Sequence, residues 1–367
     1  MTDLDIDELL RTRRIVVCCG SGGVGKTTTA AALALRAAEL GRRTVVLTID
    51  PARRLASAMG LEELDNVARR VTGVDESAGG SLDALMLDMK GTFDDIVRRT
   101  TDAQRAALIL ENPFYQSLSG HFAGTQEYMA MEKLGELDES HQWELIVVDT
   151  PPSRSALDFL DAPQRLASFL DGRLARILGG TARAGGRMGK VAIGVVGSAA
   201  SRVLGTQLFN DLSNFVTALE ATFGGFRVRA EATYQRLQSS DVSFLVVATP
   251  EPDALREASF FTGRLADRRM PLAGLVLNRV HEVGVQMPAD RADAAAEAIA
   301  KTDADVSTLL HAYAAALRQR ERERRLLARF VSAHTPVAVR EVAALPEDVH
   351  DLDGLRRVGA LLGGATD

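Results

Sequence analysis

The chain has 367 residues, a net charge of −6 and only 5% aromatic residues. This length allows one large α/β domain or two ordinary ones, and the acidic balance argues against nucleic-acid binding through phosphate neutralisation. The longest apolar run, Val191 to Ala200, is far shorter than the ~20 residues of a membrane span. The apolar run after Arg13-Arg14 is too short for a secretory signal. We therefore expect a cytoplasmic protein without direct membrane insertion.

Short β-branched and apolar runs recur along the chain between helical stretches. Continuous apolar runs, rather than alternating ones, are typical of strands buried on both faces of a parallel sheet. The expected strands are Arg14–Cys19, Thr44–Ile49, Ala84–Met89, Leu145–Asp149, Phe244–Thr249, Gly274–Val280 and Pro336–Val342. Their alternation with helices predicts a doubly wound α/β fold with a mostly parallel sheet, whose ligands lie at the carboxyl ends of the strands.

Three helical regions interrupt or follow this alternation. Residues of about 91–140 and 153–240 show long helical patterns, and the glycine-rich stretch Gly179–Lys190 divides the second. We interpret residues 1–367 as a single domain with a helical subdomain inserted in its core. The third region, Asp303–Phe330, contains RQRERERRLLAR. We interpret this charge run as a solvated face with Arg–Glu pairs rather than as a binding patch.

A glycine-rich loop carries the strongest signal in the chain. The segment GSGGVGKT fits G-x-x-x-x-G-K-[ST] and stands between an expected strand and the alanine-rich helix Thr28–Leu40. Its glycines allow consecutive backbone N–H groups to curl around a phosphate, and the helix N-terminus adds its dipole. Lys26 is expected to reach the β- and γ-phosphates and Thr27 to coordinate Mg²⁺. The predicted phosphate-binding residues are Gly20, Ser21, Gly22, Gly23, Val24, Gly25, Lys26 and Thr27.

Two further expected strands end in an aspartate. Asp50 lies in VVLTIDPARRL and Asp149 in LIVVDTPPSRS. An aspartate beside a phosphate loop can hold Mg²⁺ through water or orient an attacking water, so both are candidate magnesium residues; the alternative is a pair of helix N-caps. Pro51, Pro151 and Pro152 force the chain out of the sheet. The resulting loops could move when a γ-phosphate arrives.

The phrases GSGGVGKTT, LTIDPA and VVDTPPS resemble, in this order, the anion-pump ATPase family of deviant-Walker P-loop NTPases. That family includes the arsenite-pump ATPase subunit and the ATPase that targets tail-anchored membrane proteins. The resemblance covers almost the whole chain and extends to an actinobacterial subfamily that occurs as paralogous pairs. It implies ATP and Mg²⁺ as cofactors, with Thr28 on the α-phosphate side. It also implies that Asp50 positions the hydrolytic water and that Asp149 belongs to the magnesium shell.

Two less specific phrases resemble the base-binding elements of the family. VLNRV would place the Asn278 amide on adenine, and ALPEDVHDLDGL would place Leu345 and Pro346 near the same ring. The guanine signature N-K-x-D is absent here because Arg279 follows Asn278. The resemblance therefore implies ATP rather than GTP.

The chain departs from the family at the front of the phosphate loop. Ser21 stands where the family carries a second lysine that reaches the partner's nucleotide across a dimer. Cationic groups stabilise phosphoryl transfer, and an arginine finger accounts for ~10³–10⁵ in rate. We therefore expect slow hydrolysis in the isolated chain. Arg154 is the preferred candidate for the missing cation, with Arg53, Arg54 or a paralogous partner as alternatives.

The only cysteines, Cys18 and Cys19, are adjacent on an expected strand. Neighbours on a strand point to opposite faces, so the two thiols cannot share a soft ion. Arsenite is therefore not the expected substrate.

The resemblance implies a homodimer, or a heterodimer with a paralogous subunit, that switches with the nucleotide. Apolar side chains of the helical regions form either a groove for an apolar-helix client or the core of the insert; they are Met129, Met131, Phe159, Phe169, Phe209, Phe215 and Leu219. Three functions stay open. They are an ATPase acting on a membrane-protein client or partner, an energising or regulatory subunit of a membrane transporter, and a spatial regulator of the division-site type. The ending ALLGGATD lacks the basic amphipathic helix expected of the third.

Overall fold

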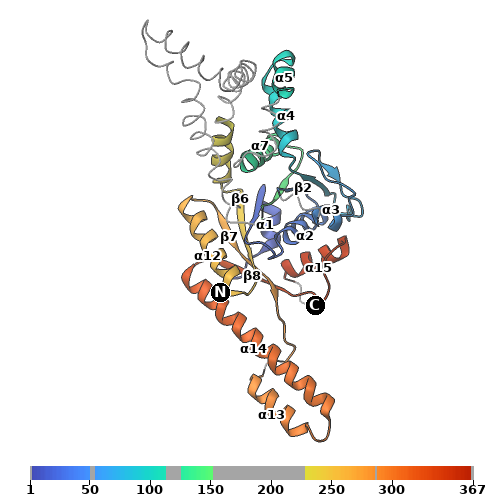
Figure 1. Ribbon diagram of the computed structural model, residues 1–367, viewed down its shortest axis with the longest axis vertical. Helices are drawn as coiled ribbons and strands as arrows, with labels where there is room; N and C mark the ends of the chain where they lie inside the picture. The colour runs from blue at the N-terminus through green and yellow to red at the C-terminus, as the bar shows by residue number, and fades with distance from the viewer. Residues whose placement is uncertain (1, 50–53, 113–124, 152–227, 286, 365–367) are drawn as a thin grey trace, which may run out of the picture. The chain divides into compact units, whose positions relative to one another are not determined.

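The computed structural model describes residues 2–49, 54–112, 125–151, 228–285 and 287–364, with the elements labelled as in Figure 1. The strands are β1 (Ile15–Cys19), β2 (Arg43–Thr48), β3 (Arg69–Arg70), β4 (Ser81–Met86), β5 (Leu145–Asp149), β6 (Val242–Ala248), β7 (Leu272–Val280) and β8 (Ala338–Ala343). The helices are α1 (Ile6–Thr12), α2 (Lys26–Glu39), α3 (Arg54–Ala58), α4 (Met89–Thr100), α5 (Ala103–Leu110), α7 (Thr125–Ser140), α12 (Pro252–Asp267), α13 (Ala289–Ile299), α14 (Ala304–Ala333) and α15 (Leu352–Leu362).

The described strands form one sheet in the order β3-β4-β2-β5-β1-β6-β7-β8. Neighbouring strands are parallel, apart from the antiparallel pair of β3 and β4 at one edge. Every residue of β1, β5 and β6 is buried, as the continuous apolar runs predict. The doubly wound, mostly parallel α/β fold is confirmed.

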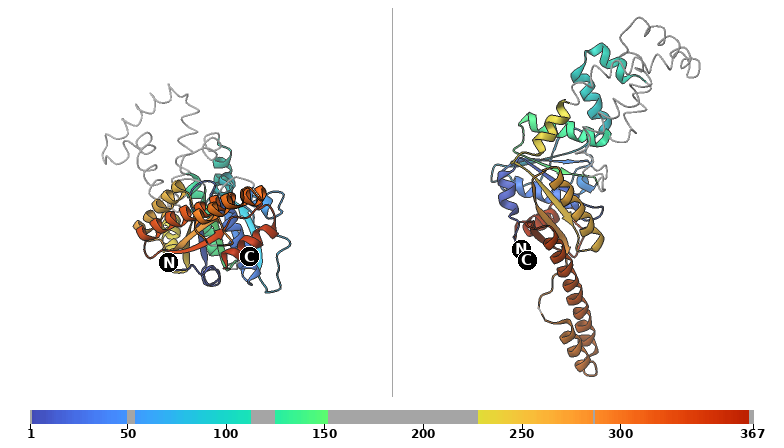
Figure 2. Two further views of the ribbon diagram at one scale, coloured as in Figure 1. Left: turned by 90° about the horizontal axis from the view of Figure 1, so that it is seen from below. Right: turned by 90° about the vertical axis from the view of Figure 1, so that its left-hand side faces the viewer.

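Helices cover both faces of the sheet. The connection from β1 through α2 leads to β2 on one side, whereas the connection from β6 through α12 leads to β7 on the other. Right-handed crossovers that run in opposite directions place their helices on opposite faces, and the right-hand view of Figure 2 shows this arrangement. The alanines of α2 allow a close approach to β2, β4 and β5, and α15 packs against α2.

The strand expected at Ala84–Met89 is wrong in its bounds. β4 begins at Ser81, opposite Arg43 of β2, and α4 already begins at Met89. The apolar pattern misleads because β4 contains a charged residue, Asp83. This carboxylate accepts a hydrogen bond from Trp143 Nε1 at 2.7 Å, so it is tolerated beside the sheet.

The chain forms two compact units. The first comprises Met1–Met86, Gln142–Ala156 and Leu237–Asp367 and contains the sheet; the second comprises Leu87–His141 and Leu157–Arg236. In the second unit, α7 is tied to the helical residues 228–236 by ion pairs of Arg229 with Glu132 (2.9 Å) and Arg236 with Asp138 (2.7 Å).

Most of the second unit lies outside the described residues, so a single inserted helical subdomain over 91–140 and 153–240 stays a prediction. The same holds for a client surface that involves Phe159, Phe169, Phe209, Phe215 and Leu219. Met129 and Met131 are 1% and 0% exposed, and they are therefore core residues of this unit.

The close packing of α2 on the sheet gives a first prediction. A Cβ on Gly80, just before β4, would lie 2.0 Å from Ala38 O and 2.6 Å from Arg42 N. Because both are backbone atoms, Gly80→Ala should lower the free energy of unfolding by ~2 kcal/mol in a urea titration. The control is Gly263→Ala in α12, where no heavy atom lies within 4 Å. This exposed change should stabilise by up to ~1 kcal/mol; equal effects of the two substitutions would contradict the packing.

Candidate nucleotide-binding site

The glycine-rich loop connects β1 to α2 at the carboxyl ends of the central strands. A Cβ on Gly20 would lie 2.2 Å from the carbonyl oxygen of Val247, in β6. Gly25 has φ +92°, and a Cβ there would lie 2.3 Å from Asn278 Nδ2. Gly20 must be glycine because β6 packs closely against it. Gly25 must be glycine because of its left-handed backbone and its close contact with Asn278.

Helix α2 begins directly at Lys26. Its N-cap is the left-handed Gly25, which provides no side-chain cap for the first-turn N–H groups. These donors therefore face the loop, which is the arrangement that binds an anion at a helix N-terminus. The Lys26 side chain is buried, at 5% exposure, and its Nζ donates to the backbone oxygen of Ser21 at 2.8 Å. The ammonium group thus closes the loop onto its own backbone.

The carboxylate of Asp149 joins three elements. Asp149 is fully buried at the end of β5, and its Oδ2 accepts hydrogen bonds from Thr27 Oγ1 at 2.8 Å and Thr48 Oγ1 at 3.0 Å. Thr48 ends β2 and pairs with Asp149 in the sheet register. Hydroxyl and carboxylate oxygens are the ligands that Mg²⁺ takes from proteins when nucleotide phosphates and waters supply the rest. The residues present therefore fit a magnesium ion.

The expected base-binding residues lie at the neighbouring strand ends. Asn278, in β7, donates from Nδ2 to the backbone oxygen of Val24 at 2.9 Å, so its amide touches the phosphate loop directly. Leu345 is half-buried and Pro346 is exposed just after β8. Ala344 N donates to the carbonyl oxygen of Val280, the last residue of β7, at 2.9 Å. This segment therefore lies beside the end of the strand that carries Asn278.

Several predicted site residues lie outside the described part of the chain. These are Asp50, Arg53 and Arg154, and the same applies to the side chain of Arg54, whose backbone begins α3. Their roles stay predictions. Ser21, at the position of the family's second lysine, is half-buried, and its carbonyl receives the Lys26 ammonium.

Sequence reasoning missed one buried acid beside the site. Glu323 of α14 has a side chain with no exposed surface. It accepts hydrogen bonds from His281 N at 3.1 Å and Gln319 Nε2 at 2.9 Å, and His281 Nδ1 lies 2.5 Å from it. Arg279 has a left-handed backbone (φ +59°) at an irregularity near the end of β7, which continues to Val280. Glu323 therefore holds His281, the first residue after the strand that carries the expected adenine-reading residue.

A periodic signal could have revealed this acid. The buried residues in the C-terminal half of α14 recur at helical spacing: Glu323, Leu327 and Phe330. Glu323 therefore lies on the same face as the apolar Leu327 and Phe330. The surrounding run of exposed arginines and glutamates conceals it.

The adjacent cysteines are inert in this environment. Both are fully buried, and desolvation raises the pKa of Cys19 to about 12. Burial, together with the negative charge of Asp149, raises the pKa of Cys18 well above its ordinary value. Both side chains therefore remain protonated thiols, and these two residues do not offer the thiolates that a soft ion requires.

Comparison with known proteins agrees with this geometry. Residues 13–304 match the family described as anion-transporting ATPase. The chain belongs to this family. ATPase GET3 of Neurospora crassa and ATPase GET3 of Podospora anserina are each 27% identical over 271 residues, 74% of this chain and 74% of each relative. ATPase GET3 of Malassezia globosa is 30% identical over 155 residues, 42% of this chain and 44% of that protein. The predicted membership in the anion-pump ATPase family is thereby confirmed.

The family members that match are named as ATPases, which supports ATPase activity here. Among the helices that the structure describes, none combines the length and the apolar character that crossing a membrane demands.

The Asp149 network gives a second prediction. Thr48→Val keeps the side-chain shape but removes a donor to a buried carboxylate, so it should lower the free energy of unfolding by ~1.5–3 kcal/mol. The control is Thr44→Val on the same strand, which loses only a bond to the backbone oxygen of Arg42 (3.2 Å) and should cost ~1 kcal/mol or less. Urea titration of both variants measures the difference; a smaller loss for Thr48→Val would contradict the network.

Glu323 gives a third prediction. Glu323→Ala releases His281 and with it the end of β7, so the Kd for ATP should rise about fivefold or more in calorimetry, since one hydrogen bond to a charged group contributes ~1.5–3 kcal/mol. Glu321→Ala is the matched control on the same helix, because Glu321 is half-exposed and pairs, among the described residues, with Arg325. An unchanged affinity in Glu323→Ala, with the fold intact by circular dichroism, would show that the end of β7 does not need this acid.

Proposed function

We propose that this chain is a magnesium-dependent ATPase whose dimer switches with the bound nucleotide and acts on a membrane-protein client or partner. The single observation that carries the nucleotide part is the juxtaposition of Lys26, Thr27 and Asp149. One ammonium group, one hydroxyl and one buried carboxylate meet beside a loop that must be glycine at both ends. This set suits a triphosphate with a hard divalent cation.

The phosphate loop supplies binding and orientation. The first-turn N–H groups of α2 donate to the phosphates, and the Lys26 ammonium exchanges the Ser21 carbonyl for phosphate oxygens when a nucleotide enters. Asn278 is already anchored to Val24, so the base and the phosphate loop are positioned together. Leu345 and Pro346 then lie beside the base, as the family resemblance implies. Binding therefore requires little rearrangement of these groups.

Thr27 and Asp149 would hold the magnesium ion, directly and through water. The ion, when bound, neutralises the charge that develops on the β- and γ-phosphates. In this proposal Asp50 positions the attacking water. Arg154 is the candidate cation in place of the missing lysine, tested by the turnover of Arg154→Ala at saturating ATP.

The partner side of the proposal rests on family membership and on the motif resemblance to tail-anchor targeting and anion-pump ATPases. The closing motion of two subunits around nucleotide would be transmitted to the helical regions. Purification with and without a non-hydrolysable ATP analogue, followed by mass measurement, tests the dimer switch. A mass that does not depend on nucleotide at any protein concentration would contradict it.

The fourth prediction concerns Lys26. Lys26→Ala should weaken ATP binding in calorimetry by about 10–100-fold, because a charge-assisted contact to phosphate contributes ~1.5–3 kcal/mol, and should abolish phosphate release. Lys301→Ala, at an exposed lysine of the same unit, is the control and should behave as the unaltered protein. Magnesium-independent binding, or equal affinity in the Lys26 and Lys301 variants, would refute the proposed site.

A further inference from the structure

Helices α13 and α14 belong to the connection between β7 and β8 and extend away from the sheet (Figure 1). A groove of about 580 Å³ runs between α14 and the segment that leads into α13. Its floor is apolar and consists of Val283, Met287, Pro288, Ala289 and Leu317. Leu317 belongs to a small core with Ala292 and Ala314, so the floor is firmly supported. We name this surface the arginine groove, after the residues of its rim.

The rim of the arginine groove carries more positive than negative charge. Five arginines line it, Arg318, Arg320, Arg322, Arg324 and Arg325, against two carboxylates, Asp290 and Glu321. This excess stands out in a chain whose net charge is −6. The groove is therefore a local basic site on an acidic protein.

Some of these arginines are already neutralised within the fold. Arg318 pairs with Asp290 and Asp293, and Arg325 pairs with Glu321 at 2.9 Å. Such exposed pairs contribute little and leave no charge to offer. They set the shape of the rim rather than its ligand preference.

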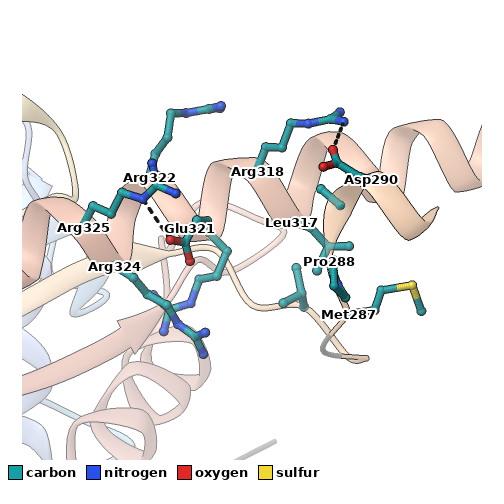
Figure 3. Close-up of a pocket in the computed structure, with 12 residues that line it drawn as sticks. Met287, Pro288, Asp290, Leu317, Arg318, Glu321, Arg322, Arg324 and Arg325 are labelled. Carbon is teal, nitrogen blue, oxygen red and sulfur yellow. Dashed lines mark hydrogen bonds and ion pairs between the residues drawn. The ribbon is translucent and has the colours of Figure 1, made fainter. Parts of the chain in front are cut away.

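Two guanidinium groups remain available. Among the described residues, Arg322 bonds only the neutral amide of Gln319, and Arg324 has no carboxylate partner. Figure 3 shows Arg322 and Arg324 extending to opposite sides of the helix, so that they flank the Glu321–Arg325 ion pair. The lining of the groove thus includes two uncompensated positive charges.

Arg320 lines the groove but is already paired. Its side chain is 16% exposed, and its Nη2 binds Glu341 at 2.6 Å. Its charge is therefore compensated within the fold, like those of Arg318 and Arg325.

We propose that the arginine groove binds an acidic peptide segment of a partner protein, with an apolar side chain on the floor and carboxylates on Arg322 and Arg324. Planar guanidinium groups match carboxylates in two-point hydrogen bonds. The apolar floor favours a peptide over polyphosphate. No aromatic side chain occurs in the described lining, so bases have no platform on which to stack, which disfavours single-stranded nucleic acid. This surface is additional to the nucleotide site and does not depend on ATP hydrolysis.

The fifth prediction tests the arginine groove with the full chain. A short fluorescein-labelled peptide of glutamates and leucines should bind in fluorescence anisotropy, more weakly at high salt because the pairs are exposed. The double variant Arg322→Glu with Arg324→Glu should weaken binding by at least about tenfold, since like charges then face the carboxylates. Arg329→Glu is the matched control, an exposed arginine of the same helix outside the groove, and should change the Kd by less than about twofold.

Further arms separate the groove from a general polyanion surface. The leucine-free glutamate peptide should bind more weakly than the parent peptide, and inorganic polyphosphate and a single-stranded oligonucleotide should compete poorly. The double variant Arg322→Gln with Arg324→Gln repeats the charge test without reversal, and melting curves report the fold. Absent binding, equal weakening by Arg329→Glu, or equal binding of oligonucleotide would each overturn the proposal. ATP affinity measured on the same variants should stay unchanged, which keeps this result independent of the nucleotide site.

Discussion

The buried carboxylate of Asp149 is the interaction on which the nucleotide site depends. A charge removed from water is costly unless donors surround it, and here the hydroxyls of Thr27 and Thr48 point at one oxygen. These residues come from the start of α2 and the ends of β2 and β5. The parallel register of β2 with β5 is what places Thr48 opposite Asp149. The strand order of the sheet therefore places the residues of the site next to one another.

The base side of the site is organised by a different chain of contacts. Asn278 reaches Val24 across 254 positions of sequence, and the same contact excludes any Cβ from Gly25. His281, just after the end of β7, is held by Glu323 of α14. The phosphate loop is thus connected through two polar contacts to a helix of the β7–β8 connection. Removing the acid should loosen the end of β7 without disturbing the Asp149 network, because the two contact sets share no residue.

Local requirements explain what the sequence could predict. The strands β1 and β5 are recognised within one residue because they are apolar throughout, and the phosphate loop because its glycines and lysine follow a fixed spacing. The two-residue β3, Arg69–Arg70, escaped prediction because its charged residues form only an edge pair with β4. Helix α13 escaped because its buried residues are only alanines. The contact of Asn278 with Val24 is tertiary and has no local signature, so Asn278 could be predicted only from the family resemblance.

The charge run of α14 shows why composition alone misjudges a helix. Interpreted as a solvated face with Arg–Glu pairs, the run is partly right, since Arg325 pairs with Glu321 one turn away. Helical periodicity, however, turns successive charged residues toward different surroundings. Glu323 enters the core, Arg320 reaches Glu341 of β8, and Arg322 and Arg324 remain on the rim of a groove with an apolar floor. On a uniformly solvated helix, all of these charged side chains would have the same aqueous surroundings. Here Glu323 and Arg320 have partners within the fold, whereas Arg322 and Arg324 line the groove without a carboxylate partner among the described residues. This difference is the structural reason to assign Arg322 and Arg324 to a partner protein.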